Sequence, residues 1–511
     1  MKKMTRRDFL KIGSAGFVLA GMPFTLSACL KRMDGVAPSH IRDYFSLFGV
    51  DEELIRQTLA VALSEGGDYA DLFFEFSTGN SIVMEDNQVN RAYISSSMGM
   101  GARVVKGDKT GYSFTEELTP DNMKSVARTA AKIAGKSGGK NPVDLKEAKL
   151  PSYYAVDKRW EDVSVKKRIQ MLEFVNNEML KRDSRITSTQ LSFNDDERFI
   201  LVAASDGVLA GDYQPMTRFN AYCVAESDGR RENNGFNLSA REDVNWFTRD
   251  KLIYLAREAV TRTISLFDAV PAPAGEMPVV LAAGSAGILL HEAIGHGMEA
   301  DFNRKGISIF SDKINKKVAE SFVNIVDDGT NQNIRGSINV DDEGIPGQKT
   351  FLVENGILKS YMHDRISAAH YGLKPTGNGR RESFKYPPQP RMRNTYMLNG
   401  PHSFEEIIRS TSHGIYADQF LNGEVYIGGG DFTFYVKSGY LIENGKLTQP
   451  VKDINIIGNG PDVLKKITMV ANDLKLAEGG WTCGKGGQSV PVSQGMPTCK
   501  VSSITVGGKN A

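Results

Sequence analysis

The sequence predicts an α+β fold in which two N-terminal α+β units are followed by a β-rich, barrel-like C-terminal domain that carries a helix with two histidines. Three observations predict this fold. At 511 residues, the chain exceeds the roughly 250–300 residues at which a single core stops growing. Strand-like and helix-like segments alternate through the first half. The second half contains two Asn-Gly turns, each between apolar runs.

The first residues have the features of an export signal. Residues 1–28 combine a basic start, a short apolar stretch and small residues ahead of Cys29. The segment TRRDFLK resembles a twin-arginine signal, and LSAC resembles a lipobox, whose cysteine is acylated after cleavage. We predict a signal peptide over 1–28 and a tether over 29–39. The mature protein is then a periplasmic or cell-envelope lipoprotein. The alternative is a disordered basic tail with a chance cysteine.

The composition limits the classes of partner. Lys+Arg 62 against Asp+Glu 61 gives a formal net charge of +1, a balance that argues against a nucleic-acid-binding protein. Hydrophobic residues make up 41% and charged residues 24% of the chain, which is ordinary for a soluble globular protein. After the signal, no segment approaches the ~20 apolar residues of a membrane span. The only membrane contact we expect is a lipid anchor at Cys29.

The two N-terminal units follow in order. In the first, 40–135, DEELIRQTLAVALSEGG predicts a helix, and ADLFFEFS, NSIVMED and GMGARVV predict strands. PDNMKSVARTAAKIAG predicts a further helix, with Pro120 in its first turn and Gly135 beyond its end. The second unit, 136–270, contains the predicted helix SVKKRIQMLEFVNNEMLKRDS, the strands RFILVAAS and GVLAGDY, and a closing helix, KLIYLAREAVTRTISLF.

The Pro/Ala/Gly-rich segment DAVPAPAGEMP marks the main boundary, and the C-terminal domain, 271–511, starts there. The strand PVVLAAG precedes Ser285, which we expect to be the N-cap of the helix AGILLHEAIGH. Asn355-Gly356 and Asn444-Gly445 predict β-hairpins. The run Gly428–Gly430 lacks the Gly-Lys-Ser/Thr ending of a phosphate-binding loop, so it predicts a bulge or a close backbone approach.

Two histidines on the predicted helix form the pattern H-E-x-x-x-H. On a regular α-helix five residues rotate by roughly 500°, which leaves His291 and His296 about 140° apart, too far round to bind one ion. A local bulge that adds one residue to the turn would bring them together, and we place this distortion at Gly295. Zinc hydrolysis needs three protein ligands and a carboxylate that takes a proton from water. His291 and His296 supply two ligands, and Glu292 supplies the base.

The residues alone leave the third ligand open. Glu299, Asp301, His363 and Cys483 are all candidates. Cys483 lies in the Gly-rich segment GGWTCGKGGQSVPVSQG, and its thiolate would complete a His₂Cys set that favours zinc.

Two further groups have open interpretations. Besides Cys29, the chain has Cys223, Cys483 and Cys499, which form no disulfide framework. In an oxidising compartment, a Cys483–Cys499 disulfide or protection of one thiolate by a metal would explain them. Arg380 and Arg381 could bind a peptide carboxylate or phosphate, or could form a charged hairpin tip.

Five stretches, HEAIGHGMEADFNRKG, PTGNGRRES, YLIENGKLTQPVKDINIIGNG, NDLKL and CGKGGQSVPVSQGMPT, resemble the TldD/PmbA family of metallopeptidases. The resemblance runs from about Tyr69 to Gly508. It implies one divalent metal ion, zinc, with His291, His296 and Cys483 as ligands and Glu292 as the catalytic base. The TldD type keeps the H-E-x-x-x-H motif, whereas the PmbA/TldE paralogue lacks it, so this chain is similar to the catalytic branch. It departs from its cytoplasmic relatives in the export signal.

The family resemblance also implies a two-subunit shell that encloses the metal and admits extended or unfolded peptides. We expect either a homodimer or a heterodimer with a PmbA/TldE-like paralogue. A metallopeptidase is the first hypothesis for function. The second is a non-catalytic, exported peptide-binding lipoprotein with a structural metal, and Glu292 argues against it, because a closed structural site needs four protein ligands and no adjacent base. A cysteine hydrolase that uses Cys483 lacks a paired histidine nearby in sequence.

Overall fold

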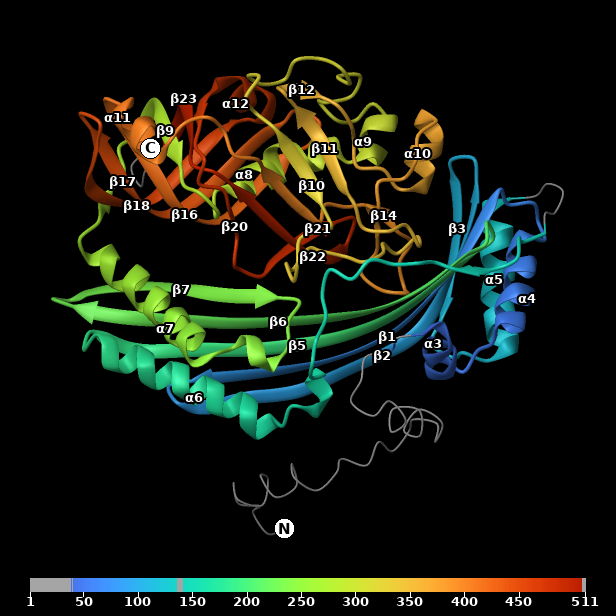
Figure 1. Cartoon of the computed structure of the whole chain (residues 1–511). Helices are drawn as coiled ribbons and strands as arrows, with labels where there is room; N and C mark the ends of the chain where they lie inside the picture. Colours follow the sequence, from blue (N-terminus) through green and yellow to red (C-terminus); the bar gives the residue numbers. More distant parts are fainter. Residues whose placement is uncertain (1–37, 39, 136–140, 508–511) are drawn as a thin grey trace, which may run out of the picture.

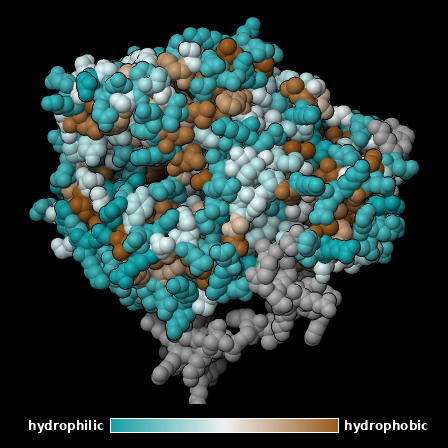
Figure 2. All heavy atoms as spheres, viewed as in Figure 1, coloured by the Kyte–Doolittle hydropathy of each residue, from teal (hydrophilic) through white to brown (hydrophobic). Residues whose placement is uncertain are grey.

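The computed structural model describes residues 38, 40–135 and 141–507 (Figure 1). The predicted signal peptide, Cys29 and the tether apart from Pro38 lie outside the described residues. Among the described helices, none has both the length and the apolar character that a membrane crossing requires. The face of the molecule in Figure 2 is mostly hydrophilic, with small separate hydrophobic areas.

One long, curved sheet joins the two N-terminal units that the sequence separates. Its main strand order is β3-β2-β1-β5-β6, with β7 and the short β4 also paired to β6. β1 and β5 are antiparallel neighbours from Asp71–Ala204 to Glu85–Gln190, so the units share main-chain hydrogen bonds along this length. The strands are β1 (Tyr69–Glu85), β2 (Gln88–Lys106), β3 (Lys109–Thr115), β4 (Lys146–Glu147), β5 (Ile186–Ala204), β6 (Val208–Ser227) and β7 (Arg230–Ala240).

Helices cover one face of this sheet. They are α3 (Ile41–Phe48), α4 (Glu52–Leu63), α5 (Pro120–Ala134), α6 (Val165–Arg182) and α7 (Arg249–Ile264), with the 3₁₀ turns η1 (Trp160–Asp162), η2 (Val244–Trp246) and η3 (Ser265–Phe267). The predicted signals at both ends of α5 are confirmed: Pro120 lies in its first turn, and Gly135 ends it with a φ of 102°. Apolar strand residues such as Phe193 and Phe219 pack against α6 and α7 in one core cluster.

The opposite face of the sheet changes character along its length. Because side chains alternate along a strand, the pairs Phe73–Val202, Ser77–Arg198 and Gly79–Asp196 of β1 and β5 lie on this same face. At the end of this face where Phe73 and Val202 lie, these two side chains pack against Val340 and Phe384 of the C-terminal domain. Beyond that end, the face carries small and polar side chains. The C-terminal domain lies above this face in Figure 1, and α6 lies on the other side of the sheet.

The C-terminal domain contains two seven-stranded sheets with the main orders β12-β11-β10-β15-β22-β20 and β19-β23-β9-β16-β17-β18-β8. The expected β-rich character is present, but the sheets do not form one clear barrel. In the second sheet β23 also pairs with β18 over three residue pairs, whereas the first sheet stays open. Parallel pairings of β16 with β9 and of β15 with β22 bring strands from distant parts of the chain together in these sheets.

The strands of this domain are β8 (Val270–Pro271), β9 (Gly275–Leu281), β10 (Ile325–Asp328), β11 (Lys349–Glu354), β12 (Ile357–Leu358), β13 (Gly379–Arg380), β14 (Gln389–Pro390), β15 (Asn394–Met397), β16 (His413–Tyr426), β17 (Asp431–Glu443), β18 (Lys446–Asn459), β19 (Ile467–Val470), β20 (Lys475–Leu476), β21 (Trp481–Lys485), β22 (Gln488–Met496) and β23 (Cys499–Gly507). Its helices are α8 (Gly287–Leu290), η4 (His291–Gly295), η5 (His296–Met298), α9 (Ala300–Arg304), α10 (Arg365–Tyr371), α11 (Phe404–Arg409) and α12 (Gly460–Lys466).

Both predicted Asn-Gly hairpins are confirmed. Asn355 and Gly356 have φ values of 48° and 74° and connect β11 to β12, while Asn444 and Gly445, at 51° and 73°, connect β17 to β18. The predicted N-cap at Ser285 is wrong, because the capping residue of α8 is Ala286. The Ser285 hydroxyl instead donates to the main-chain oxygen of Asp418 on β16, 2.6 Å away.

Candidate metal centre

The two histidines lie in a helical run whose geometry changes at the first of them. After the single α-helical turn of α8, residues His291–Gly295 form a π-helical turn, and His296–Met298 form a 3₁₀ turn. The wider π turn accommodates one extra residue, so residues five apart reach the same side of the helix. The ring centroids of His291 and His296 are 5.0 Å apart. This is the change of geometry that the H-E-x-x-x-H spacing requires, and it ends at Gly295.

Neighbouring segments approach the π turn too closely to allow side chains at three glycines. A Cβ at Gly295 would lie 2.1 Å from Met392 Sδ, and one at Gly287 would lie 2.5 Å from the main-chain nitrogen of Gly495 on β22. On the other side, a Cβ at Gly460 of α12 would lie 2.1 Å from the main-chain oxygen of Ala293. Close packing on several sides therefore holds the wider turn in place.

Cys483 on β21 joins the two histidines. The ligand atoms of His291, His296 and Cys483 all lie within 4.8 Å of one another, and the three residues are buried, at 3%, 6% and 3% exposure. Two ligands about 2.0–2.3 Å from one tetrahedral ion lie roughly 3.3–3.8 Å apart. Cys483 Sγ is 3.4 Å from His296 Nε2. The three residues can therefore hold one ion, and they are the one such group within the part of the chain that the structure describes.

The donor set fits a zinc ion. His291 Nδ1 is buried and has no hydrogen-bond partner among the described residues. The described part of the protein therefore leaves this ring nitrogen without a partner. Burial acts to raise the pKa of the Cys483 thiol, but His291 and His296 hold that pKa well below its ordinary value. The thiolate is the form of cysteine that binds a metal. Two imidazoles and one thiolate form a donor set suited to zinc.

Glu292 borders the ligand set from a more open position. Its Oε2 atom is 3.8 Å from His296 Nε2, and its side chain is 21% exposed, against 7% for the side chain of His296. Burial raises the pKa of its carboxyl, and the neighbouring His291 and His296 act to lower that pKa. A carboxylate with a raised pKa, beside the ligands and open to solvent, can accept a proton from water and later return it.

The other candidates for the third ligand lie outside the set. Glu299 is fully buried and accepts a hydrogen bond from His296 Nδ1 at 2.9 Å, so it supports a ligand from behind. Asp301 pairs with Lys485 Nζ at 2.7 Å. His363 lies apart, and burial lowers the pKa of its imidazole to about 4.

Lys485 is a site residue that sequence reasoning missed. Its Nζ atom is 3.0 Å from Glu299 Oε2, so an ammonium, a carboxylate and an imidazole form a chain that ends at His296. Burial acts to raise the pKa of the Glu299 carboxyl, yet Lys485 and His296 lower that pKa to about 2. Lys485 follows Cys483 by two residues on β21, so the two side chains share a face. The two-residue spacing of Cys483 and Lys485 in the CGK motif could have indicated that Lys485 belongs to the site.

Two alternatives from the sequence are corrected. The Cys483–Cys499 disulfide is wrong, because Cys223, Cys483 and Cys499 are free, buried thiols. Arg380 and Arg381 do not form an exposed hairpin tip, since their exposures are 5% and 1%. Burial raises the pKa of the Cys223 thiol to about 11, which makes this cysteine a poor nucleophile.

Comparisons with known proteins agree on one family. Residues 274–508 match the PmbA/TldA metallopeptidase C-terminal domain, residues 70–134 match domain 1 of the same family, and residues 158–267 match its central domain. The chain is 41% identical over 450 residues to the metalloprotease TldD homolog of Haemophilus influenzae, covering 87% of this chain and 93% of the relative. It is 40% identical over 236 residues to the zinc metalloprotease TldD homolog of Saccharolobus solfataricus, covering 46% of this chain and 52% of the relative.

Solved structures show the same fold. TldE from Thermococcus kodakarensis superimposes with a TM-score of 0.70 at 20% identity, covering 89% of this chain and 99% of that chain. A protein from Thermotoga maritima superimposes with a TM-score of 0.73 at 22% identity, covering 89% of this chain and all of that chain.

Proposed function

Since this chain belongs to the PmbA/TldA metallopeptidase family and is a metalloprotease of the TldD/PmbA type, we propose that it hydrolyses extended or unfolded peptides at one zinc ion held by His291, His296 and Cys483. The convergence of these three side chains from segments far apart in the sequence is the observation that carries the proposal. A relative named a zinc metalloprotease supports zinc as the metal.

Each site residue has a separate role in this proposal. Bound zinc would polarise the scissile carbonyl and make water a stronger acid. Glu292 is the general base: it takes a proton from the attacking water and passes it to the leaving amine. Glu299 accepts a hydrogen bond from His296 Nδ1, which leaves the Nε2 lone pair free for the metal. Lys485 fixes Glu299 in turn through its contact with Oε2.

The surroundings of the site support an extended peptide as substrate. A cleft of about 950 Å³ lies between β7 and α7 on one side and the C-terminal domain on the other, and Gly479, Gly480 and Trp481 line it. Trp481 is the first residue of β21, two positions before Cys483, whereas Glu292 and the three ligands do not line this cleft. The small and polar face of the long sheet could bind a peptide main chain without selecting its side chains. We propose that strand addition to the C-terminal sheet contributes further main-chain hydrogen bonds.

We propose an enclosed cavity formed by two subunits, as a homodimer or with a PmbA/TldE-like paralogue. The likeness to a structure named TldE supports a pairing of this kind. For location, we propose an exported periplasmic or cell-envelope lipoprotein anchored at Cys29, which rests on the sequence alone.

The two alternatives are weaker. The family assignment and the names of the relatives disfavour a non-catalytic peptide-binding lipoprotein. For a cysteine hydrolase, the fold supplies the histidine that the sequence lacks nearby, because Cys483 Sγ contacts His296 Nε2. However, the third donor, His291, and relatives named metalloproteases favour the metal site.

Metal analysis combined with peptide digestion tests the proposal. Glu292→Gln should retain zinc and the fold but lose about 10²–10⁴-fold in turnover, because an amide cannot accept the proton from water. His291→Ala should lose both zinc and activity. A zinc-loaded Glu292→Gln protein with near-normal turnover would remove Glu292 from the mechanism. A His291→Ala protein that keeps full zinc affinity would remove His291 from the ligand set.

A further inference from the structure

β21, the strand that carries Cys483, is held by its neighbouring strand and by side chains. Its neighbouring strand, β22, pairs with it in antiparallel register from Trp481–Val492 to Lys485–Gln488. Three alternate carbonyl oxygens of β21 also accept hydrogen bonds from side chains. Arg335 Nε donates to Trp481 at 2.9 Å, Arg391 Nη2 donates to Cys483, and Gln389 Nε2 donates to Lys485 at 3.0 Å. Side chains thus hold the main chain of β21 in addition to its pairing with β22.

Arg391 provides the contact at the ligand residue itself. It is fully buried, and its second terminal nitrogen, Nη1, donates to the carbonyl of Gln488 on β22 at 3.2 Å. One guanidinium therefore ties the two strands of the hairpin together beside Cys483. Arg380 links β22 to the segment after Arg391: it donates to the main-chain oxygens of Met392 at 2.6 Å and of Pro491 on β22 at 2.8 Å. Burial lowers the pKa of Arg380 to about 9.

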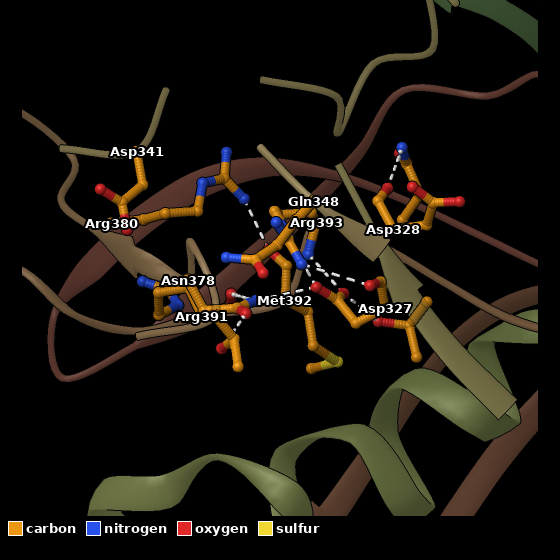
Figure 3. Close-up of polar contacts among 12 residues, drawn as sticks. Asp327, Asp328, Asp341, Gln348, Asn378, Arg380, Arg391, Met392 and Arg393 are labelled. Atoms are coloured by element: carbon orange, nitrogen blue, oxygen red, sulfur yellow. Dashed lines mark hydrogen bonds and ion pairs between the residues drawn. The ribbon is translucent and has the colours of Figure 1, made fainter. Parts of the chain in front are cut away.

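Met392, the residue after Arg391, contacts the turn that carries the two histidine ligands. Met392 is fully buried, and its sulfur occupies the space that a side chain at Gly295 would need. Arg391 and Met392 are consecutive, so one short segment contacts both the Cys483 carbonyl and the π turn that carries the histidines. Figure 3 shows this segment, with Arg380 donating a hydrogen bond to the carbonyl of Met392 and Arg393 paired with Asp327.

We propose that Arg391 is a positioning residue for the metal site: its guanidinium fixes the main chain of Cys483 at the distance from His291 and His296 that one ion requires. This inference rests on the proposed function, because it assumes Cys483 as a ligand. The histidines lie on a turn packed against Met392, and Cys483 lies on a hairpin in which Arg391 bonds one carbonyl of each strand. Without Arg391, the carbonyls of Cys483 and Gln488 lose a buried side-chain donor, and the hairpin can move away from the helix.

Arg391→Lys tests the proposal, because lysine keeps the charge but cannot donate to both hairpin carbonyls as a planar guanidinium does. The readouts are zinc affinity by chelator competition and the thiolate-to-metal absorption band of the Co²⁺-substituted protein. Losing a group behind a ligand typically lowers metal affinity by about 10–100-fold, and we expect this loss together with a weakened or shifted band. Arg393→Lys is the matched control, since Arg393 is also fully buried but pairs with Asp327 at 2.7 Å; its zinc affinity should stay within about 2-fold of the parent.

A double-mutant cycle with Cys483→Ser separates positioning from general destabilisation. If Arg391 acts through Cys483, Arg391→Lys should lower zinc affinity little further once Cys483 is serine. Equal effects of Arg391→Lys in both backgrounds, or an affinity matching that of Arg393→Lys, would overturn the inference. If Cys483→Ser alone keeps full zinc affinity, the ligand set of the proposed function fails instead. Urea unfolding of the metal-free variants checks that each one folds.

Discussion

Replacing Glu299 by glutamine tests the support behind the metal ligands. Glu299 is fully buried, and one oxygen, Oε2, accepts hydrogen bonds from both His296 Nδ1 at 2.9 Å and Lys485 Nζ at 3.0 Å. Glutamine keeps the shape and one acceptor oxygen but removes the negative charge. His296 then becomes a less basic ligand, because its Nδ1–H donates to a neutral amide rather than to a carboxylate.

The expected loss of stability follows from the contacts of Lys485 and Glu299. Breaking a buried ion pair costs about 3–5 kcal/mol when it leaves a lone charge. Lys485 Nζ, however, keeps Asp301 at 2.7 Å and the Pro390 carbonyl at 3.0 Å. Glu299 Oε1 has no hydrogen-bond partner among the described residues, so an amide NH₂ placed there is a buried unsatisfied donor, which costs about 1–3 kcal/mol. We expect the free energy of unfolding to fall by about 1–3 kcal/mol and zinc affinity by about 10–100-fold.

Two measurements on matched variants check this expectation. Chelator competition gives zinc affinity, and urea unfolding of the metal-free protein gives stability. Asp301→Asn is the control, because it removes the other carboxylate on Lys485 without touching His296. It should leave zinc affinity almost unchanged. Equal losses of affinity in both variants would show that the charge near Lys485 matters and that the hydrogen bond to His296 does not, which would refute the reasoning.

Three further predictions concern packing, substrate and location. Gly295→Ala should lower the free energy of unfolding by about 1–3 kcal/mol through overlap with Met392; in urea unfolding, Gly484→Ala, with open space around it, should show no such loss. In a digestion assay, a tightly folded domain should resist cleavage while its denatured form is cut, and equal rates would contradict an enclosed site. Cys29→Ser should release the protein from the membrane fraction, because the acyl anchor is missing; a native protein found full-length in the cytoplasm would contradict export.

Local signals in the sequence determined several elements and the chemistry of the site. Helix α5 lies between Pro120 and Gly135 because a ring-fixed φ starts a helix and a positive φ ends it. The Asn-Gly turns at 355–356 and 444–445 form hairpins because both residues tolerate positive φ. The five-residue spacing lets the two histidines bind one metal ion only on a widened turn, and His291–Gly295 is a π turn.

Tertiary structure decided whatever depends on contacts between distant segments. Cys483 meets His296 across 187 positions, and no local spacing distinguishes it from Glu299 or His363 as a ligand. The joining of the two N-terminal units follows from the pairing of β1 with β5, and Ser285 fails as a cap because it bonds to Asp418 instead. A helix end or a tight turn is determined by a few consecutive residues. Strand partners, ligand sets and the buried side chains that support them depend on how the whole chain packs, so they became visible only in the folded structure.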